Sequence, residues 1–220
     1  MKRIAYLVLL VLCIPSILCA QDKIDIPVWN VGDQWAYSDT SPYLNIQGAI
    51  EVVAADQDTY TAEFSGDMCI AETQNFTTIV FEKSTLHRIY YLRNNVREEY
   101  ERGRRRLFNF PLNPGKQWDD EYSGASLIRG VGAPVLDFFE NYKVLGWEDV
   151  EVPAGKFKAI KLEITMGHGA KGNVSASNFT NIYWYSPDVK HFVKCQYDPN
   201  LRGISADIFN WELSSFKVKK

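Results

Sequence analysis

Apolar and polar residues alternate along most of this chain, and this pattern constrains its fold more than any other feature. The alternation begins at Trp35 and Tyr37 and returns at Trp211 and Leu213. Such spacing puts apolar side chains on one face of a β-strand, because successive side chains in a strand point to opposite faces. The same pattern occurs at Ile50 to Ala54, Tyr60 to Phe64, and Val193 to Tyr197. No segment has the spacing of a long amphipathic helix.

Turn-forming residues separate the alternating segments. Asp56-Gln57-Asp58 and Pro153-Ala154-Gly155 are two such turns, and their spacing is typical of antiparallel strands that follow one another along the sheet. Asn94-Asn95 lies between two strand-like segments, and asparagine tolerates the positive φ of a two-residue hairpin turn. We therefore predict a hairpin in which Arg88 opposes Glu101.

The first 20 residues have the pattern of a secretory signal. Two basic residues, Lys2-Arg3, precede the apolar run Ile4 to Leu12, and Ala20 is suitable for cleavage. Lipidation at Cys19 is the alternative, which the bulky leucine before it disfavours. We expect residues 21–220 to form a single exported β-domain, periplasmic or extracellular, without a transmembrane span.

Composition excludes several classes of protein. Hydrophobic residues make up 46% of the chain and charged residues 23%, which is typical of a folded domain. Removing Lys2 and Arg3 with the signal takes the net charge from −3 to −5, opposite in sign to a general nucleic-acid binder. Two cysteines remain, Cys69 and Cys195, and the sequence is consistent with either one disulfide or two buried thiols.

Three motifs resemble a known family. Trp-Asn-Val-Gly-Asp-Gln-Trp-Ala-Tyr at 29–37, Val-Pro-Ala-Gly-Lys-Phe-Lys-Ala at 152–159 and Tyr-Trp-Tyr-Ser-Pro-Asp-Val at 183–189 resemble a group of secreted, uncharacterised, all-β bacterial envelope domains. The resemblance implies a strongly curved antiparallel sheet or an open barrel. It brings no catalytic residues.

The predicted fold is therefore all-β: a single strongly curved antiparallel sheet, or an open barrel, of meandering strands. A sheet without helices must cover its apolar face with a second sheet, by barrel closure or with a ligand. If the sheet curls, the two ends of the mature chain meet, and we expect their aromatic residues to line one interior. These residues are Trp35, Tyr37, Trp184, Phe209 and Trp211. The segment Gly124 to Leu136 could then form a loop at the mouth of a cavity.

Four arginines form the sharpest charge feature of the chain. They are Arg102, Arg104, Arg105 and Arg106. Guanidinium groups bind phosphates and carboxylates well, so the run is a candidate contact for anionic lipid or polysaccharide. Glutamates at 98, 99 and 101 precede it, and mutual neutralisation across a hairpin is the favoured interpretation.

No catalytic, cofactor or metal constellation emerges. Gly167 to Gly172 matches G-x-G-x-x-G, but a strand-like segment follows it instead of a helix, so we expect a hairpin loop. The three histidines are scattered, and Ser126 lacks the second glycine of a nucleophile elbow. Alternation puts Asp119 and Glu121 on one face, which we expect to be solvated.

These observations predict a non-enzymatic exported envelope protein without a cofactor. Its concave aromatic face would bind or shield an apolar small molecule, a lipid or an envelope protein. A carbohydrate-binding module and an assembly scaffold are the alternatives, and a hydrolase is disfavoured.

Overall fold

The computed structural model describes residues 23–40, 47–66, 78–93, 95–99, 102–125, 135–170, 173–197 and 210–220. These residues form strands, turns and extended segments, and none of them forms a helix that could cross a membrane. The twelve strands are β1 (Gln34–Asp39), β2 (Gln47–Ala55), β3 (Thr59–Gly66), β4 (Thr78–Glu82), β5 (Arg88–Arg93), β6 (Val96–Glu99), β7 (Gln117–Ala125), β8 (Val135–Val152), β9 (Gly155–Ala170), β10 (Asn173–Ser186), β11 (His191–Gln196) and β12 (Trp211–Lys217).

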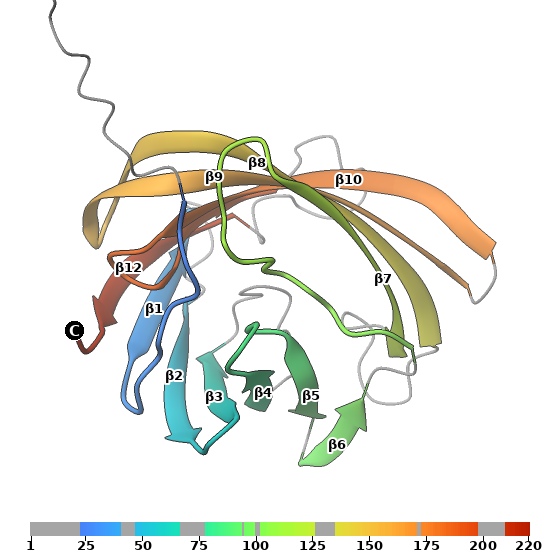
Figure 1. The fold of residues 1–220 in the computed structure, drawn as a ribbon, viewed down its shortest axis with the longest axis horizontal. Coiled ribbons are helices and arrows are strands. Elements are labelled where there is room, and N and C mark those ends of the chain that lie inside the picture. Colours follow the sequence, from blue (N-terminus) through green and yellow to red (C-terminus); the bar gives the residue numbers. More distant parts are fainter. Residues whose placement is uncertain are drawn as a thin grey trace, which may run out of the picture.

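All twelve strands belong to one antiparallel sheet that curls into an open barrel (Figure 1). The order across the sheet is β6-β5-β4-β3-β2-β1-β12-β11-β10-β9-β8-β7. Apart from β6 and β7, strands that follow one another in the sequence are neighbours in the sheet, and β1 pairs with β12, so the two ends of the domain meet. The free edges are β6 and β7. The predicted all-β, strongly curved sheet is confirmed.

Alternation in the sequence becomes alternation of burial. Trp35 and Tyr37 of β1 are buried, and so are Ile50 and Val52 of β2, while the residues between them are half-buried. The apolar side chains of facing strands therefore meet inside the barrel. Burying an aromatic or branched aliphatic side chain is worth about 1.5–3 kcal/mol, so this interior is the main source of stability.

The predicted hairpin at Asn94-Asn95 is confirmed in the described pairs. Tyr90 opposes Glu99 and Arg93 opposes Val96, the register that the two-residue loop requires. Asn95 has a φ of 64°, as expected for such a turn. The predicted partner of Arg88, residue 101, lies outside the described residues, so the pairing of Arg88 with Glu101 stays a prediction.

A long hairpin of β8 and β9 arches over the barrel (Figure 1). Its tip is the predicted turn at Pro153-Ala154, and the backbone N–H of Ala154 donates to the carbonyl of Leu213, 3.0 Å away in β12. At the other end, Gly167 and Gly169 lie within β9. β9 pairs with β10 as the expected hairpin requires, but residues 167–170 belong to the strand, and residues 171–172 lie outside the described residues.

The connection between the two free edges crosses the barrel. We call residues 102–116 the strap. In Figure 1 it runs in green between β8–β10 on one side and β1–β5 on the other. Arg102 forms an antiparallel bridge with Ser123 of β7, and Leu112 forms one with Ile24. Gly103 is required at the first bridge, because its φ is 67° and a Cβ there would lie 2.5 Å from the carbonyl oxygen of Glu121.

Candidate functional site

Three of the five predicted interior aromatics lie together. Trp35, Tyr37 and Trp211 are each at most 1% exposed. The rings of Tyr37 and Trp211 meet edge to face, with centroids 4.8 Å apart, and the ring of His191 lies 4.8 Å from that of Trp35 and 6.1 Å from that of Tyr37. The pairing of β1 with β12 is what brings these rings together.

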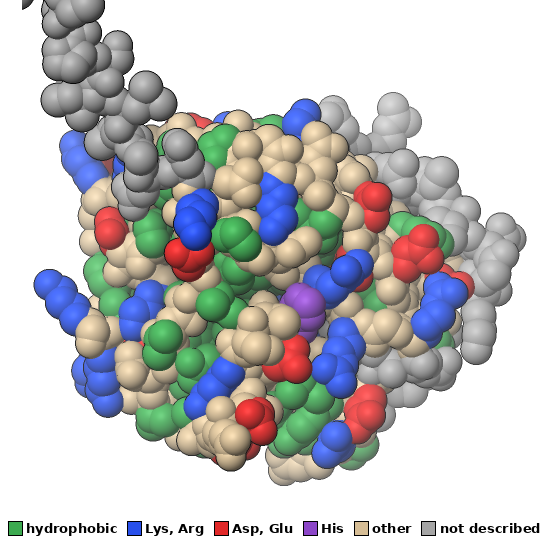
Figure 2. Space-filling model, viewed as in Figure 1, with side chains coloured by type: hydrophobic (Ala, Val, Ile, Leu, Met, Phe, Trp, Pro, Cys, Tyr) green, Lys and Arg blue, Asp and Glu red, His purple; other side chains and the backbone are tan. Residues whose placement is uncertain are grey.

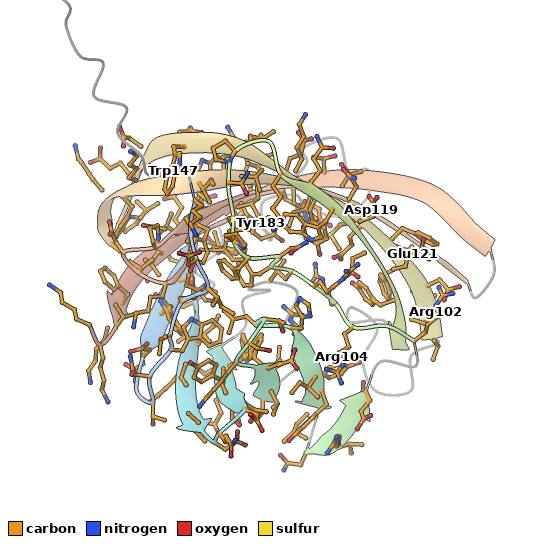
Figure 3. All side chains as sticks on the ribbon, viewed as in Figure 1. Arg102, Arg104, Asp119, Glu121, Trp147 and Tyr183 are labelled. Carbon is orange, nitrogen blue, oxygen red and sulfur yellow. The ribbon has the colours of Figure 1, made fainter. Side chains whose placement is uncertain are left out.

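Trp184 is buried, at 4% exposed, but it lies on the opposite face of the sheet from Tyr183, which corrects the prediction that it lines the same interior. Its indole N–H donates to Glu148, and the ammonium groups of Lys161 and Lys194 lie 5.1 and 5.7 Å from its ring. The preceding residue, Tyr183, points inward and packs on the ring of Phe192 (Figure 3). Three consecutive aromatics cannot all face one side of a strand, and the middle one faces out. Phe209 lies outside the described residues.

His191 is an interior residue that the sequence did not single out, because a lone histidine carries no motif. Its Nδ1 lies 2.7 Å from the hydroxyl of Tyr37, which is also 3.0 Å from the carbonyl of Phe192. Burial is the main cause that lowers the pKa of His191 to about 3; a hydrogen bond with the backbone of Phe192 opposes the shift, and the nearby charge of Arg88 adds to it. The ring is therefore neutral at physiological pH and serves as a polar element of the core.

Acid should destabilise the protein through His191. The unfolded chain binds a proton near pH 6.5 and the folded chain only near pH 3, so stability is lost as pH falls through this window. Between pH 6 and pH 4 we expect His191 to contribute a loss of about 2.5 kcal/mol. Urea unfolding of the wild type and of His191→Gln at both pH values measures it. Equal losses in the two proteins would contradict the assignment.

The strap covers the aromatic interior. The ring of Phe108 stacks on those of Phe192 and Phe110, with centroids 5.1 and 5.2 Å away, and meets Tyr185 edge to face. Trp29, in the segment before β1, donates its indole N–H to the carbonyl of Lys190. Of the rings that were expected to face a ligand, Trp35 lies 5.6 Å from the ring of Trp29. Phe192 and Tyr185, which Phe108 covers, were not among the predicted residues but belong to the same interior.

Arg105 is fully buried with Glu140 (Figure 3 shows the neighbouring Arg102 and Arg104). Its Nε and Nη2 lie 3.0 and 2.9 Å from the two carboxylate oxygens. Tyr122 and Tyr142 donate their hydroxyls to the same carboxylate. Burial, and then the charge of Glu140, raises the pKa of Tyr142 well above its usual value, so this hydroxyl keeps its proton. The carboxylate thus has four donors.

Two other arginines of the run also face carboxylates of β7 and β8. Arg106 donates from Nε to Asp120, 2.9 Å away, and from Nη2 to the carbonyl of Asp119. Arg102 lies 3.7 Å from Asp137. Arg102, Arg105 and Arg106 are thus paired with carboxylates of β7 and β8, whereas the prediction was neutralisation by the preceding glutamates. The run covers the free edge of β7, which would otherwise offer unpaired backbone groups.

Three of the four arginines of the run face solvent as candidate anion contacts. Arg102 and Arg104 are exposed, the side chain of Arg102 at 58%, and Arg106 is about half exposed, with 43% of its side chain accessible. Arg105 alone among the four is buried. Figure 2 shows basic and acidic side chains interspersed over the face that carries the strap. Anion binding by the run stays a prediction, limited to these exposed groups.

The remaining chemical candidates are dispersed. Asp119 and Glu121 point outward from β7, as expected (Figure 3), while Asp120 between them is buried against Arg106. Among the residues that the structure describes, no three histidine, cysteine or acidic side chains are grouped to hold a metal ion. Cys195 is buried in β11. Cys69, Ser126 and the segment between Ala125 and Val135 lie outside the described residues, so those expectations stay predictions.

A groove with a volume of about 600 Å³ lies on the outer face of the sheet. It crosses β12, β1, β2, β3 and the start of β4, opposite the aromatic interior. Its outward side chains are Gln34, Ala36, Ala49, Glu51, Glu63, Ser65, Thr78, Ser215 and Lys217, with Asn95 at one end. Sequence analysis missed this surface, because it needs five strands in register to exist.

Comparison with known proteins gives a likeness of fold. No family model and no curated protein matches the chain. A crystal structure of a protein inferred to be exported, with a YmcC-like fold, from Bacteroides fragilis is similar over 88% of this chain and 99% of that chain, with 13% identity and a TM-score of 0.50. This likeness shows the fold.

Two further solved structures lie at lower similarity. A protein inferred to be a lipoprotein from Parabacteroides distasonis has 13% identity and a TM-score of 0.49, over 90% of this chain and 100% of that chain. The hypothetical lipoprotein YmcC from Escherichia coli has 8% identity and a TM-score of 0.44, over 87% and 90%.

Proposed function

We propose that this is an exported, non-enzymatic envelope protein that acts as an interaction scaffold. In this function the barrel interior stabilises the fold and the outer face of the sheet binds a partner. Export is supported by the signal-like residues 1–20 and by the protein from Bacteroides fragilis that shares the fold and is inferred to be exported. The observation that carries the scaffold function is the strap, whose side chains cover the aromatic interior.

An interior that binds an apolar ligand needs space beside its rings, typically about 300 Å³ or more. Phe108 instead contacts Phe192 and Tyr185 directly, at 5.1 and 5.6 Å between centroids. Moving the strap away would expose Leu107 and Phe108, each at most 5% exposed, and would separate the buried pair of Arg105 with Glu140. This cost favours the scaffold over the apolar carrier.

Native mass spectrometry of protein purified from an exporting host tests the proposal. We expect the mass of the processed chain without a bound lipid. A lipid retained in a fixed ratio would contradict the scaffold and support an apolar ligand on the aromatic face. Specific binding on a glycan array would support the carbohydrate-binding alternative. The same spectrum distinguishes cleavage after Ala20 from lipidation at Cys19.

A further inference from the structure

Resting on this scaffold function, we propose that the outer groove binds an extended, positively charged segment of a partner protein. The outer groove is the surface of about 600 Å³ formed by the outward side chains of β12, β1, β2, β3 and the start of β4. The shape of the groove and its charge both contribute to this assignment.

The shape of the groove suits an extended segment. Trp35 and Ile50 point into the barrel, so Ala36 and Ala49 beside them point outward and leave the backbone of the sheet accessible. Strands lie about 4.8 Å apart, so a groove over five strands is about 19 Å long. An extended peptide rises about 3.3 Å per residue and would place about six residues there.

The charge of the groove favours a cation, because its lining holds two glutamates against one lysine, Lys217. Glu51 of β2 and Glu63 of β3 are directly opposed across the strands. Neither carboxylate forms an ion pair or a hydrogen bond with any other described residue. Two other glutamates of the outer face do have partners: Glu148 pairs with Lys161, and Glu212 with Lys194.

Opposed like charges destabilise a sheet, so folding does not explain this pair. A lysine or arginine side chain laid across both carboxylates would compensate them. A neutral glycan would leave the two charges unmatched. A metal ion would have only two carboxylates, since no group of three ligands occurs among the described residues. The side chains of Gln34, Thr78 and Asn95 add hydrogen-bonding groups around the pair.

The test uses capped tetralysine as the probe, with its affinity for the exported protein measured by calorimetry at physiological salt. Glu51→Gln with Glu63→Gln removes the pair. Glu121→Gln with Asp149→Asn is the matched control, because it removes two exposed carboxylates that lie outside the groove and changes the net charge equally. We expect the groove variant to bind at least about tenfold more weakly and the control to change less than about twofold.

A second measurement separates binding from folding. Removing opposed like charges should keep or raise the thermal midpoint of the groove variant, so its weaker binding would not reflect unfolding. Equal weakening in the groove and control variants would show attraction by net charge alone and overturn the proposal. Absence of binding by the wild type would also overturn it. If native mass spectrometry still showed no lipid, the scaffold function itself would stand.

Discussion

Replacing Arg105 with methionine is expected to lower the free energy of unfolding by about 3–5 kcal/mol. The side chains of Arg105 and Glu140 are both 0% exposed, and the guanidinium contacts both carboxylate oxygens. Methionine fills similar space but leaves Glu140 as a buried charge without its cation. The hydroxyls of Tyr122 and Tyr142 remain, but they cannot neutralise it. Urea unfolding at pH 7 measures the effect.

A double variant and a surface control sharpen this experiment. Arg105→Met combined with Glu140→Leu removes both charges, and we expect it to be more stable than Arg105→Met alone, because no buried charge is left. Arg104→Met makes the same substitution at the neighbouring exposed position, where we expect a change within about 0.5 kcal/mol. Similar losses at positions 104 and 105 would show that the buried pair is not what makes Arg105 important.

The sheet could be predicted from the sequence, because its determinants are local. Alternation at Trp35 and Tyr37 fixes which side chains face inward, and the turn at Asn94-Asn95 fixes a hairpin register. The contact between the two ends of the chain could also be predicted, because a curled sheet brings its terminal strands together and their apolar faces can then be buried against each other. Each of these inferences uses residues that are close in sequence, or one general property of closed sheets.

The strap and its partners could not be predicted, because they depend on contacts between distant segments. The pair of Arg105 and Glu140 joins residues 35 positions apart. The glutamates just before the arginines were nearer in sequence as possible partners, but Glu99 forms an ion pair with Arg97 of its own strand. Likewise, nothing in Tyr183-Trp184-Tyr185 tells which of three aromatics faces outward. The register of β10 with its neighbours decides it.

Replacing Trp211 with alanine is expected to cost about 3–5 kcal/mol of stability. The indole is 1% exposed, its ring meets that of Tyr37 at 4.8 Å, and Tyr183 lies 6.1 Å away. Alanine would leave a cavity beside Tyr37 of β1 and Tyr183 of β10 that these rings cannot fill without moving the backbone of paired strands. Urea unfolding at pH 7 gives the loss, and Trp211→Phe should recover part of it because an aromatic ring is kept.

The size of this loss distinguishes a core from a ligand site. If Trp211 is a core residue, Trp211→Ala shows the full expected loss of about 3–5 kcal/mol, and native mass spectrometry finds no ligand in either protein. If Trp211 faced a ligand, its ring would be partly unpacked in the free protein, and its replacement would cost less stability. A loss below about 1.5 kcal/mol, together with a lipid that the wild type binds and the variant does not, would contradict the scaffold function. The strap favours the first outcome, because Phe108 packs on Phe192, whose ring in turn lies 5.0 Å from that of Tyr183. The contacts from the strap to Trp211 are therefore continuous, and the indole has packed partners on the side where a ligand would otherwise lie.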